Sequence, residues 1–105
     1  MPGLVENLKD LHALVHELDD TRMTTMAQVS NLPMENEQND ITDVVSYNHY
    51  FGWYGGKLED NEAWLDAFHE MRPERPIGIS EYGCEGITTY HNDNPKARLQ
   101  TKEFQ

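Results

Sequence analysis

A short apolar run at residues 77–81 constrains the fold more than any other feature of the chain. The run reads Ile-Gly-Ile-Ser-Glu and is followed by Tyr82 and Gly83. Near-continuous apolar runs are typical of parallel strands buried on both faces, and ligands bind at the carboxyl ends of such strands. Glu81 is therefore expected at the mouth of a site, and Gly83 permits a sharp turn beyond it. An ordinary strand end with a solvated Glu is the alternative.

The spacing of apolar residues along the rest of the chain predicts the other elements. These elements are, in order, a helix over about residues 3–18, strands over about 24–30 and 43–50, a helix over about 61–71 and the strand at 77–81. Asp60 or Asn61 is expected to cap the second helix. The polar segment 31–40 is expected to lie on the surface as a loop or one short helical turn.

This order of elements is typical of α/β architecture, with parallel strands joined by right-handed crossovers. A closed (βα)8 barrel needs on the order of 200 to 250 residues. The 105 residues of this chain hold about three strands. Residues 1–105 are therefore expected to form one unit, either a small open α/β sheet or a TIM-barrel fragment with about three parallel strands and flanking helices.

The charge of the chain excludes two classes of partner. Its 19 acidic and 8 basic residues give a net charge of −11, which repels nucleic acid and anionic membranes. No stretch approaches the roughly 18 apolar residues of a membrane span, and the N-terminus lacks the features of a signal peptide. Cys84 is the only cysteine, so an internal disulfide is excluded. A cytoplasmic location fits the chain as given, although an internal piece of a longer protein would carry no signal peptide either.

An aromatic, glycine-rich segment follows the second predicted strand. It contains Phe51, Gly52, Trp53, Tyr54, Gly55 and Gly56. The glycines favour a flexible surface loop that exposes ring faces. Packing of Trp53 and Tyr54 against the helix at 61–71 is the alternative.

Two motifs, in this order, carry a resemblance to a known family. Residues 48–54 read Asn-His-Tyr-Phe-Gly-Trp-Tyr, and residues 79–83, after an amphipathic helix, read Ile-Ser-Glu-Tyr-Gly. Together they resemble the later barrel strands of family 2 glycoside hydrolases, the β-galactosidase and β-glucuronidase group. Residues 17–22, ahead of a Thr-rich strand, are also similar to that family. The resemblance covers the chain up to about residue 91 and implies the C-terminal part of a catalytic TIM barrel.

The resemblance also implies roles for single residues. Glu81 is implied as the nucleophile of a retaining β-glycosidase, and Tyr50 as the tyrosine that orients it by a hydrogen bond. The positions implied to lie near the sugar are Asn48, His49, Trp53 and Tyr54. A packing role at the rim is the alternative for His49. The first motif resembles the bacterial β-galactosidase branch more than the others, so a β-galactoside is the expected carbohydrate substrate.

The second carboxyl group of such an enzyme is not expected in this chain. A retaining glycosidase needs two carboxyl groups roughly 5 to 5.5 Å apart, and Glu81 supplies one. The family's acid/base glutamate follows an asparagine at the end of an earlier strand, which the resemblance places upstream of Met1. The pairs Asn36-Glu37 and Asn61-Glu62 do not follow a buried strand and are interpreted as structural. The isolated chain is therefore expected to be inactive.

No metal or cofactor is expected, because the candidate ligands lack the spacing of a zinc site. These candidates are His49, Cys84, Glu85 and His91. Cys84 is interpreted as an inert thiol, since no histidine partner can be located from the sequence.

Two other classes of function stay open beside the glycosidase fragment. A self-contained carbohydrate-binding module would use Trp53, Tyr54 and Glu81 without chemistry. A structural fragment would associate through its exposed barrel edges. An open sheet of three strands has unpaired edges, so a homo-oligomer is expected in each case.

Overall fold

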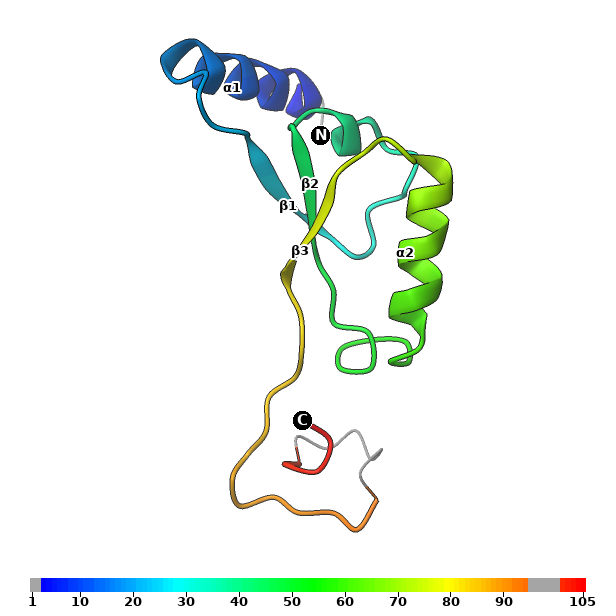
Figure 1. Cartoon of the computed structure of the whole chain (residues 1–105). Helices are drawn as coiled ribbons and strands as arrows, with labels where there is room; N and C mark the ends of the chain where they lie inside the picture. Colours follow the sequence, from blue (N-terminus) through cyan, green and yellow to red (C-terminus); the bar gives the residue numbers. More distant parts are fainter. Residues whose placement is uncertain (1–2, 95–100) are drawn as a thin grey trace.

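Three parallel strands form the centre of the computed structural model, which describes residues 3–94 and 101–105 (Figure 1). The sheet has the order β1-β2-β3, and both strand pairs are parallel. In chain order the elements are α1 (Leu4–Leu18), β1 (Thr25–Val29), the 3-10 helix η1 (Glu37–Asp40), β2 (Val44–Asn48), α2 (Asp60–Met71) and β3 (Ile77–Glu81). The predicted three parallel strands with flanking helices are confirmed.

The ends of the elements differ from the prediction in ways that bear on the site. β2 ends at Asn48, two residues before the predicted end, so Tyr50 lies in the loop beyond the strand. The predicted cap of α2 is wrong: Glu59 occupies the N-cap position and makes no side-chain cap bond. The carboxylate of Asp60 instead accepts the backbone N–H of Lys57 at 2.6 Å. Asp60 therefore fixes the loop before α2.

The core lies between β2 and α2. Val45 and Tyr47 of β2 and Phe68 of α2 are fully buried. The partly buried apolar side chains packed against them are Leu32, Met34, Trp64 and Ile77. The Tyr47 hydroxyl donates to Asn39 Oδ1 at 2.7 Å, and Asn39 is itself fully buried. The prediction that segment 31–40 lies on the surface is therefore wrong for Asn39, which completes the core.

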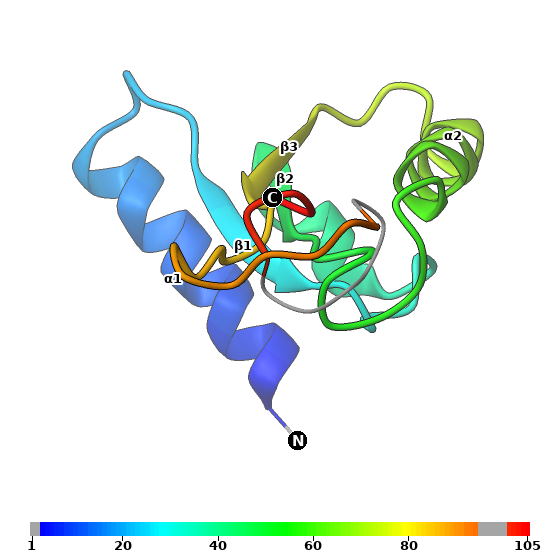
Figure 2. The same cartoon turned by 90° about the horizontal axis from the view of Figure 1, so that it is seen from below.

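α1 is packed much less closely than α2. The sheet lies between the two helices in both views (Figures 1 and 2). None of the residues of α1 is buried. The exposed members of its apolar stripe are Leu4, Leu11, Leu14, Val15 and Leu18. Among the described residues, no helix is both long and apolar enough to span a bilayer.

The segment after β3 runs away from the sheet (Figure 1). Gly83 has φ of 98°, a left-handed conformation that glycine adopts without strain, but residues 82–87 form no turn or bend, so the sharp turn expected after Glu81 is absent from this segment. The molecule measures 54 by 29 by 28 Å, and its radius of gyration is 17.2 Å. A compact domain of this length has a radius of about 13 Å. The chain is thus elongated, with β1 and β3 as the outer strands of its sheet.

Candidate active site

The carboxyl ends of the parallel strands meet at one edge of the sheet, and an irregular register shapes that edge. Tyr47 pairs with Ile79, but the next residue, Asn48, pairs with Glu81. Ser80 is therefore an extra residue in β3, which makes a β-bulge. Bulges of this kind change the direction in which a side chain points.

The bulge places Glu81 with the polar residues of β2. Strict alternation along β3 would give Glu81 the same face as Ile77 and Ile79, since side chains alternate with a period of two. Instead, the Glu81 carboxylate accepts a hydrogen bond from the Tyr50 hydroxyl. Ser80 Oγ donates to Asn48 Oδ1 at 2.7 Å. The chain thus contains the Tyr50–Glu81 contact that the motifs imply, and its geometry depends on Ser80.

The Tyr50–Glu81 pair has clear electrostatic consequences. The Glu81 carboxylate accepts a hydrogen bond from the Tyr50 hydroxyl, and this bond raises the pKa of the Tyr50 phenol above its usual value of 10.0. Tyr50 therefore stays a hydrogen-bond donor throughout the neutral range. Glu81 is exposed, so its carboxylate is accessible to a ligand. One oxygen is fixed by Tyr50, and the group remains open on the side of the solvent.

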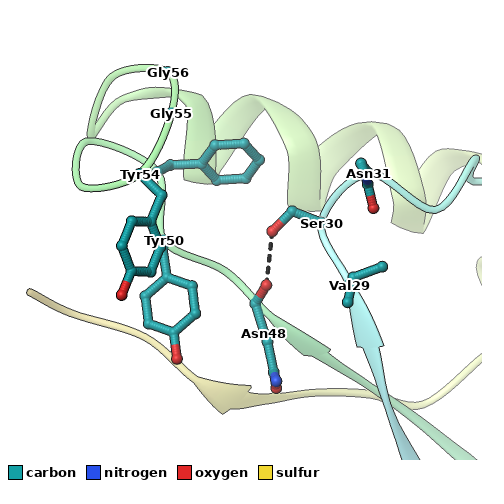
Figure 3. A pocket seen from close by; sticks show the side chains of 9 residues that line it. Val29, Ser30, Asn31, Asn48, Tyr50, Tyr54, Gly55 and Gly56 are labelled. Atoms are coloured by element: carbon teal, nitrogen blue, oxygen red, sulfur yellow. Dashed lines mark hydrogen bonds between the residues drawn. The ribbon is translucent and has the colours of Figure 1, made fainter.

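A cavity of about 620 Å³ lies beside Tyr50, the partner of Glu81 (Figure 3). Its lining residues are Val29, Ser30, Asn31, Asn48, Tyr50, Phe51, Tyr54, Gly55 and Gly56. The rings of Tyr50 and Tyr54 meet edge to face, with centroids 5.0 Å apart. Tyr54 is 78% exposed. Aromatic faces combined with a few polar groups suit a polar ligand that carries apolar ring faces, such as a sugar.

His49 lies on the other side of β2, away from this cavity. The His49 side chain is 2% exposed and stacks on Tyr47 and Phe51, with ring centroids 5.1 and 4.9 Å away. Trp64 of α2 meets the same ring at 4.2 Å. Burial lowers the pKa of His49 below its usual value of 6.5, which favours a neutral ring. His49 thus has the packing environment that the sequence left as an alternative to a sugar contact.

Trp53 is also separated from the cavity. It lines a second hollow, of about 380 Å³, together with His49 and Ile79. The structure therefore brings four of the six candidates together, through the cavity and the Tyr50–Glu81 bond. These four are Asn48, Tyr50, Tyr54 and Glu81. His49 and Trp53 line the 380 Å³ hollow, and neither lines the 620 Å³ cavity.

Two serines at this edge escaped the sequence analysis. Ser30 Oγ donates to the backbone oxygen of Asn48 at 2.6 Å and lies 2.9 Å from His49 Nδ1. Ser80 binds the side chain of the same asparagine. Ser30 directly follows β1. The expectation that ligands bind at the carboxyl ends of parallel strands, which pointed to Glu81, therefore applied to Ser30 as well. Both serines hold Asn48 in place.

The two Asn-Glu pairs lie apart from this edge. Glu37, in η1, contacts Lys9 of α1 at 3.3 Å. Glu62 is exposed in the first turn of α2, and the Asn61 side chain donates to the Leu58 oxygen at 3.0 Å. The described part of the chain places no carboxyl group among the lining residues of the 620 Å³ cavity. Glu81 is the carboxylate bonded to that lining through Tyr50.

Comparison with known families supplies the decisive observation. Residues 2–105 match the family described as glycosyl hydrolases family 2, TIM barrel domain. The chain belongs to glycosyl hydrolase family 2. The three parallel strands of the chain are accordingly a fragment of the family's TIM barrel.

Similar proteins share this barrel segment. A β-glucuronidase of Bacteroides fragilis is 42% identical over 90 residues, which cover 86% of this chain and 12% of that protein. The crystal structure of an FMN-binding β-glucuronidase from Facaelibacterium prausnitzii L2-6 is 51% identical, with a TM-score of 0.94, over 100% of this chain and 16% of that one. A Bacteroides uniformis β-glucuronidase, covalently bound to cyclophellitol-6-carboxylate aziridine, is 36% identical with a TM-score of 0.88, over 96% and 12%. The chain thus spans less than a fifth of the length of each.

Proposed function

We propose that this chain supplies the nucleophile and one wall of the sugar pocket of a retaining β-glycosidase. The observation that carries the proposal is the exposed Glu81 carboxylate at the carboxyl end of β3, held by Tyr50 beside the 620 Å³ cavity. In TIM-barrel enzymes this end of the strands carries the catalytic groups. Family membership supports glycoside hydrolysis as the chemistry.

The proposed reaction is a double displacement. A Glu81 oxygen attacks the anomeric carbon of the sugar, forming an ester while the bond to the leaving oxygen breaks. A second carboxyl group, supplied outside the described residues, protonates the leaving oxygen and then takes a proton from water. That water attacks the anomeric carbon, the ester bond breaks, and the Glu81 carboxylate is regenerated. Two displacements at the same carbon retain its configuration.

The remaining residues divide by the side of β2 on which they lie. We assign Tyr50 as a positioning residue, because its donated hydrogen bond fixes the carboxylate that attacks. Asn48 and Tyr54 are assigned as sugar contacts, because both line the cavity. We assign His49 and Trp53 a packing role in place of the sugar contact that the motifs imply, because both line the second hollow and neither lines this cavity.

The similar proteins favour a β-glucuronide as the substrate class. The three relatives described above are β-glucuronidases by name, and one is bound covalently to a compound with a 6-carboxylate. The expected β-galactoside rests on the form of the 48–54 motif and stays a prediction. The two sugars differ in the configuration at C4 and at the 6-position, where a glucuronide carries a carboxylate, so a direct comparison separates them.

A covalent label tests both the nucleophile and the sugar. The intact gene product is incubated with cyclophellitol-6-carboxylate aziridine, and separately with its galactose-configured counterpart, and the labelled peptide is identified by mass spectrometry. We expect one adduct on Glu81, formed faster by the uronate probe, and no adduct in Glu81→Gln. Glu85→Gln, which removes an exposed carboxylate of the same segment, should label as the wild type does. Labelling at another residue would overturn the assignment of Glu81.

The isolated chain of 105 residues is proposed to be inactive and to self-associate. Both outer strands and the apolar stripe of α1 support association, since they leave backbone and leucine side chains uncovered. Size-exclusion chromatography with light scattering should give more than one copy per particle. Hydrolysis of a chromogenic β-glucuronide by the chain alone would contradict the proposed inactivity. A monomer at high concentration would contradict the proposed self-association.

A further inference from the structure

A cluster of polar side chains lies at the amino ends of the strands, opposite the edge that carries Glu81. His12 and His16 are one helical turn apart on α1 and therefore share a face. Asp43 directly precedes β2, and Thr24 directly precedes β1. The amphipathic pattern places both histidines off the apolar stripe of α1. All four side chains are half-buried instead, where α1 meets the sheet.

The contacts within this cluster are close and involve several elements. His16 Nε2 lies 2.7 Å from Asp43 Oδ2, and His12 Nδ1 lies 2.8 Å from Thr24 Oγ1. His12, His16 and Asp43 each offer one ligand atom, and these three atoms all lie within 4.8 Å of one another. The Asp43 carboxylate also accepts the backbone N–H of Thr24 at 2.8 Å, which fixes its orientation.

We propose that His12, His16 and Asp43 bind a zinc ion, with water in the fourth position. Two imidazoles and one carboxylate are a common ligand set for Zn²⁺, at bond lengths of about 2.0–2.2 Å. Tetrahedral geometry then requires ligand atoms roughly 3.3 Å apart. The His16–Asp43 contact of 2.7 Å has to widen slightly, and the His12 ring has to turn from Thr24 toward the shared centre. Nitrogen ligands disfavour Mg²⁺ and Ca²⁺, which prefer all-oxygen sites.

Such an ion stabilises the attachment of α1 to the sheet. α1 has no buried side chain, so few apolar contacts hold it against β1 and β2. A metal bound by His12, His16 and Asp43 would join α1 to the start of β2. The described core includes no residue of α1, so this link would add to few other contacts. Because the site lies at the opposite ends of the strands from Glu81, its role is structural. It is independent of the proposed glycosidase reaction.

The test measures zinc binding by the intact gene product after treatment with a chelator and dialysis. Isothermal titration with ZnCl₂ is expected to show a site that is lost in His12→Ala and His16→Ala, each weakening its affinity by roughly 100-fold or more. ZnCl₂ should also raise the melting temperature of the wild type and not that of these variants. His69→Ala, which removes an exposed histidine of α2, serves as the matched control and should behave as the wild type does.

Further measurements keep the proposal open to contradiction. Co²⁺ in place of Zn²⁺ is expected to give the visible absorption bands of a tetrahedral site, and His12→Gln should lose them while its circular dichroism stays unchanged. MgCl₂ and CaCl₂ should leave the melting temperature unchanged. Zinc affinity unaffected by both histidine substitutions, or equal stabilisation by Ca²⁺, would overturn the site. Glycosidase activity per folded molecule should be the same in all variants, so failure here leaves the proposed function untouched.

Discussion

The two faces of β2 have opposite characters, although they belong to the same five residues and the loop that follows. On one face Tyr47, and His49 just beyond the strand, are buried against Trp64 and Phe68 of α2. On the other face Asn48, and Tyr50 beyond the strand, border an open cavity and contact Ser80 and Glu81. The first face contributes stability, and the second is available for chemistry.

This difference shows that neighbouring residues of a motif need not share a task. Residues 48–50 read Asn-His-Tyr, and the middle residue points away from the other two. A period of two along extended backbone is the reason. Changes on the cavity face should therefore affect activity and leave stability intact, whereas changes on the α2 face should do the reverse.

The largest effect is expected from Glu81→Gln, on the cavity face. Loss of the nucleophile should lower kcat of the intact gene product by about 10⁴-fold or more. Because Glu81 is exposed, the melting temperature should stay close to that of the wild type. Steady-state hydrolysis of a chromogenic β-glucuronide and a thermal melt measure the two quantities, with Glu85→Gln as the control. A large loss of stability in Glu81→Gln would break the distinction between the faces.

Phe68→Ala should give the largest loss of stability on the α2 face. Removing this fully buried ring leaves a cavity against Tyr47 and should lower the free energy of unfolding by about 3–5 kcal/mol. Leu14→Ala on α1 also truncates an apolar side chain in a helix, but at an exposed position, and should cost less than about 1 kcal/mol. Urea unfolding of both variants at one protein concentration measures the contrast. Equal losses would mean that α1 is packed as closely as α2.

Tyr50→Phe should have an intermediate effect, again on activity. The substitution removes the hydrogen bond to the Glu81 carboxylate and keeps the ring. Hydrogen bonds to charged groups contribute about 1.5–3 kcal/mol, so kcat should fall by roughly 10- to 150-fold. Tyr82→Phe, at a position that is 81% exposed, is the control and should change little. An unchanged kcat in Tyr50→Phe would argue against its positioning role.

The smallest effect is expected from His49, as a dependence of stability on pH. Burial lowers the pKa of His49 in the folded protein below 6.5, so the unfolded chain binds this proton more readily. The stabilisation is therefore complete above about pH 6.5 and decreases as the pH falls below it. His49→Gln should flatten the melting temperature between pH 8 and 5 relative to the wild type. His69→Gln should keep the wild-type slope, and an equally steep slope in His49→Gln would contradict the buried, neutral ring.

The sequence allowed prediction of the elements because each has a strong apolar pattern. The run at 77–81 predicted β3 correctly, although none of its residues is buried in this chain, and the helical spacing before it predicted α2, which buries Phe68. The contact between Tyr50 and Glu81 came from family resemblance, since no local pattern joins residues 31 positions apart. Asn39 could not be predicted as buried, because its burial depends on the hydroxyl of Tyr47, eight residues away in the chain.

The sequence predicts which residues share a face with His49, but it does not predict whether that face packs against a helix or borders the cavity. Alternation along residues 47–50 already separates Tyr47 and His49 from Asn48 and Tyr50. Which of the two faces is covered by a helix depends on where α2 packs, and the spacing of apolar residues does not contain that information. For the same reason the half-buried positions of His12 and His16 appear only when α1 is placed beside the sheet.

The extra residue in β3 makes the candidate active site sensitive to strand register as well as to residue identity. If β3 paired without the bulge, with Ser80 opposite Asn48, every side chain that is proposed to take part in the reaction would be preserved. Simple alternation would nevertheless turn Glu81 by half a period, to the side of the sheet that carries Ile77 and Ile79. A sequence alignment would match the carboxylate in either register, so in this strand the pairing of residues is itself part of the information that specifies function.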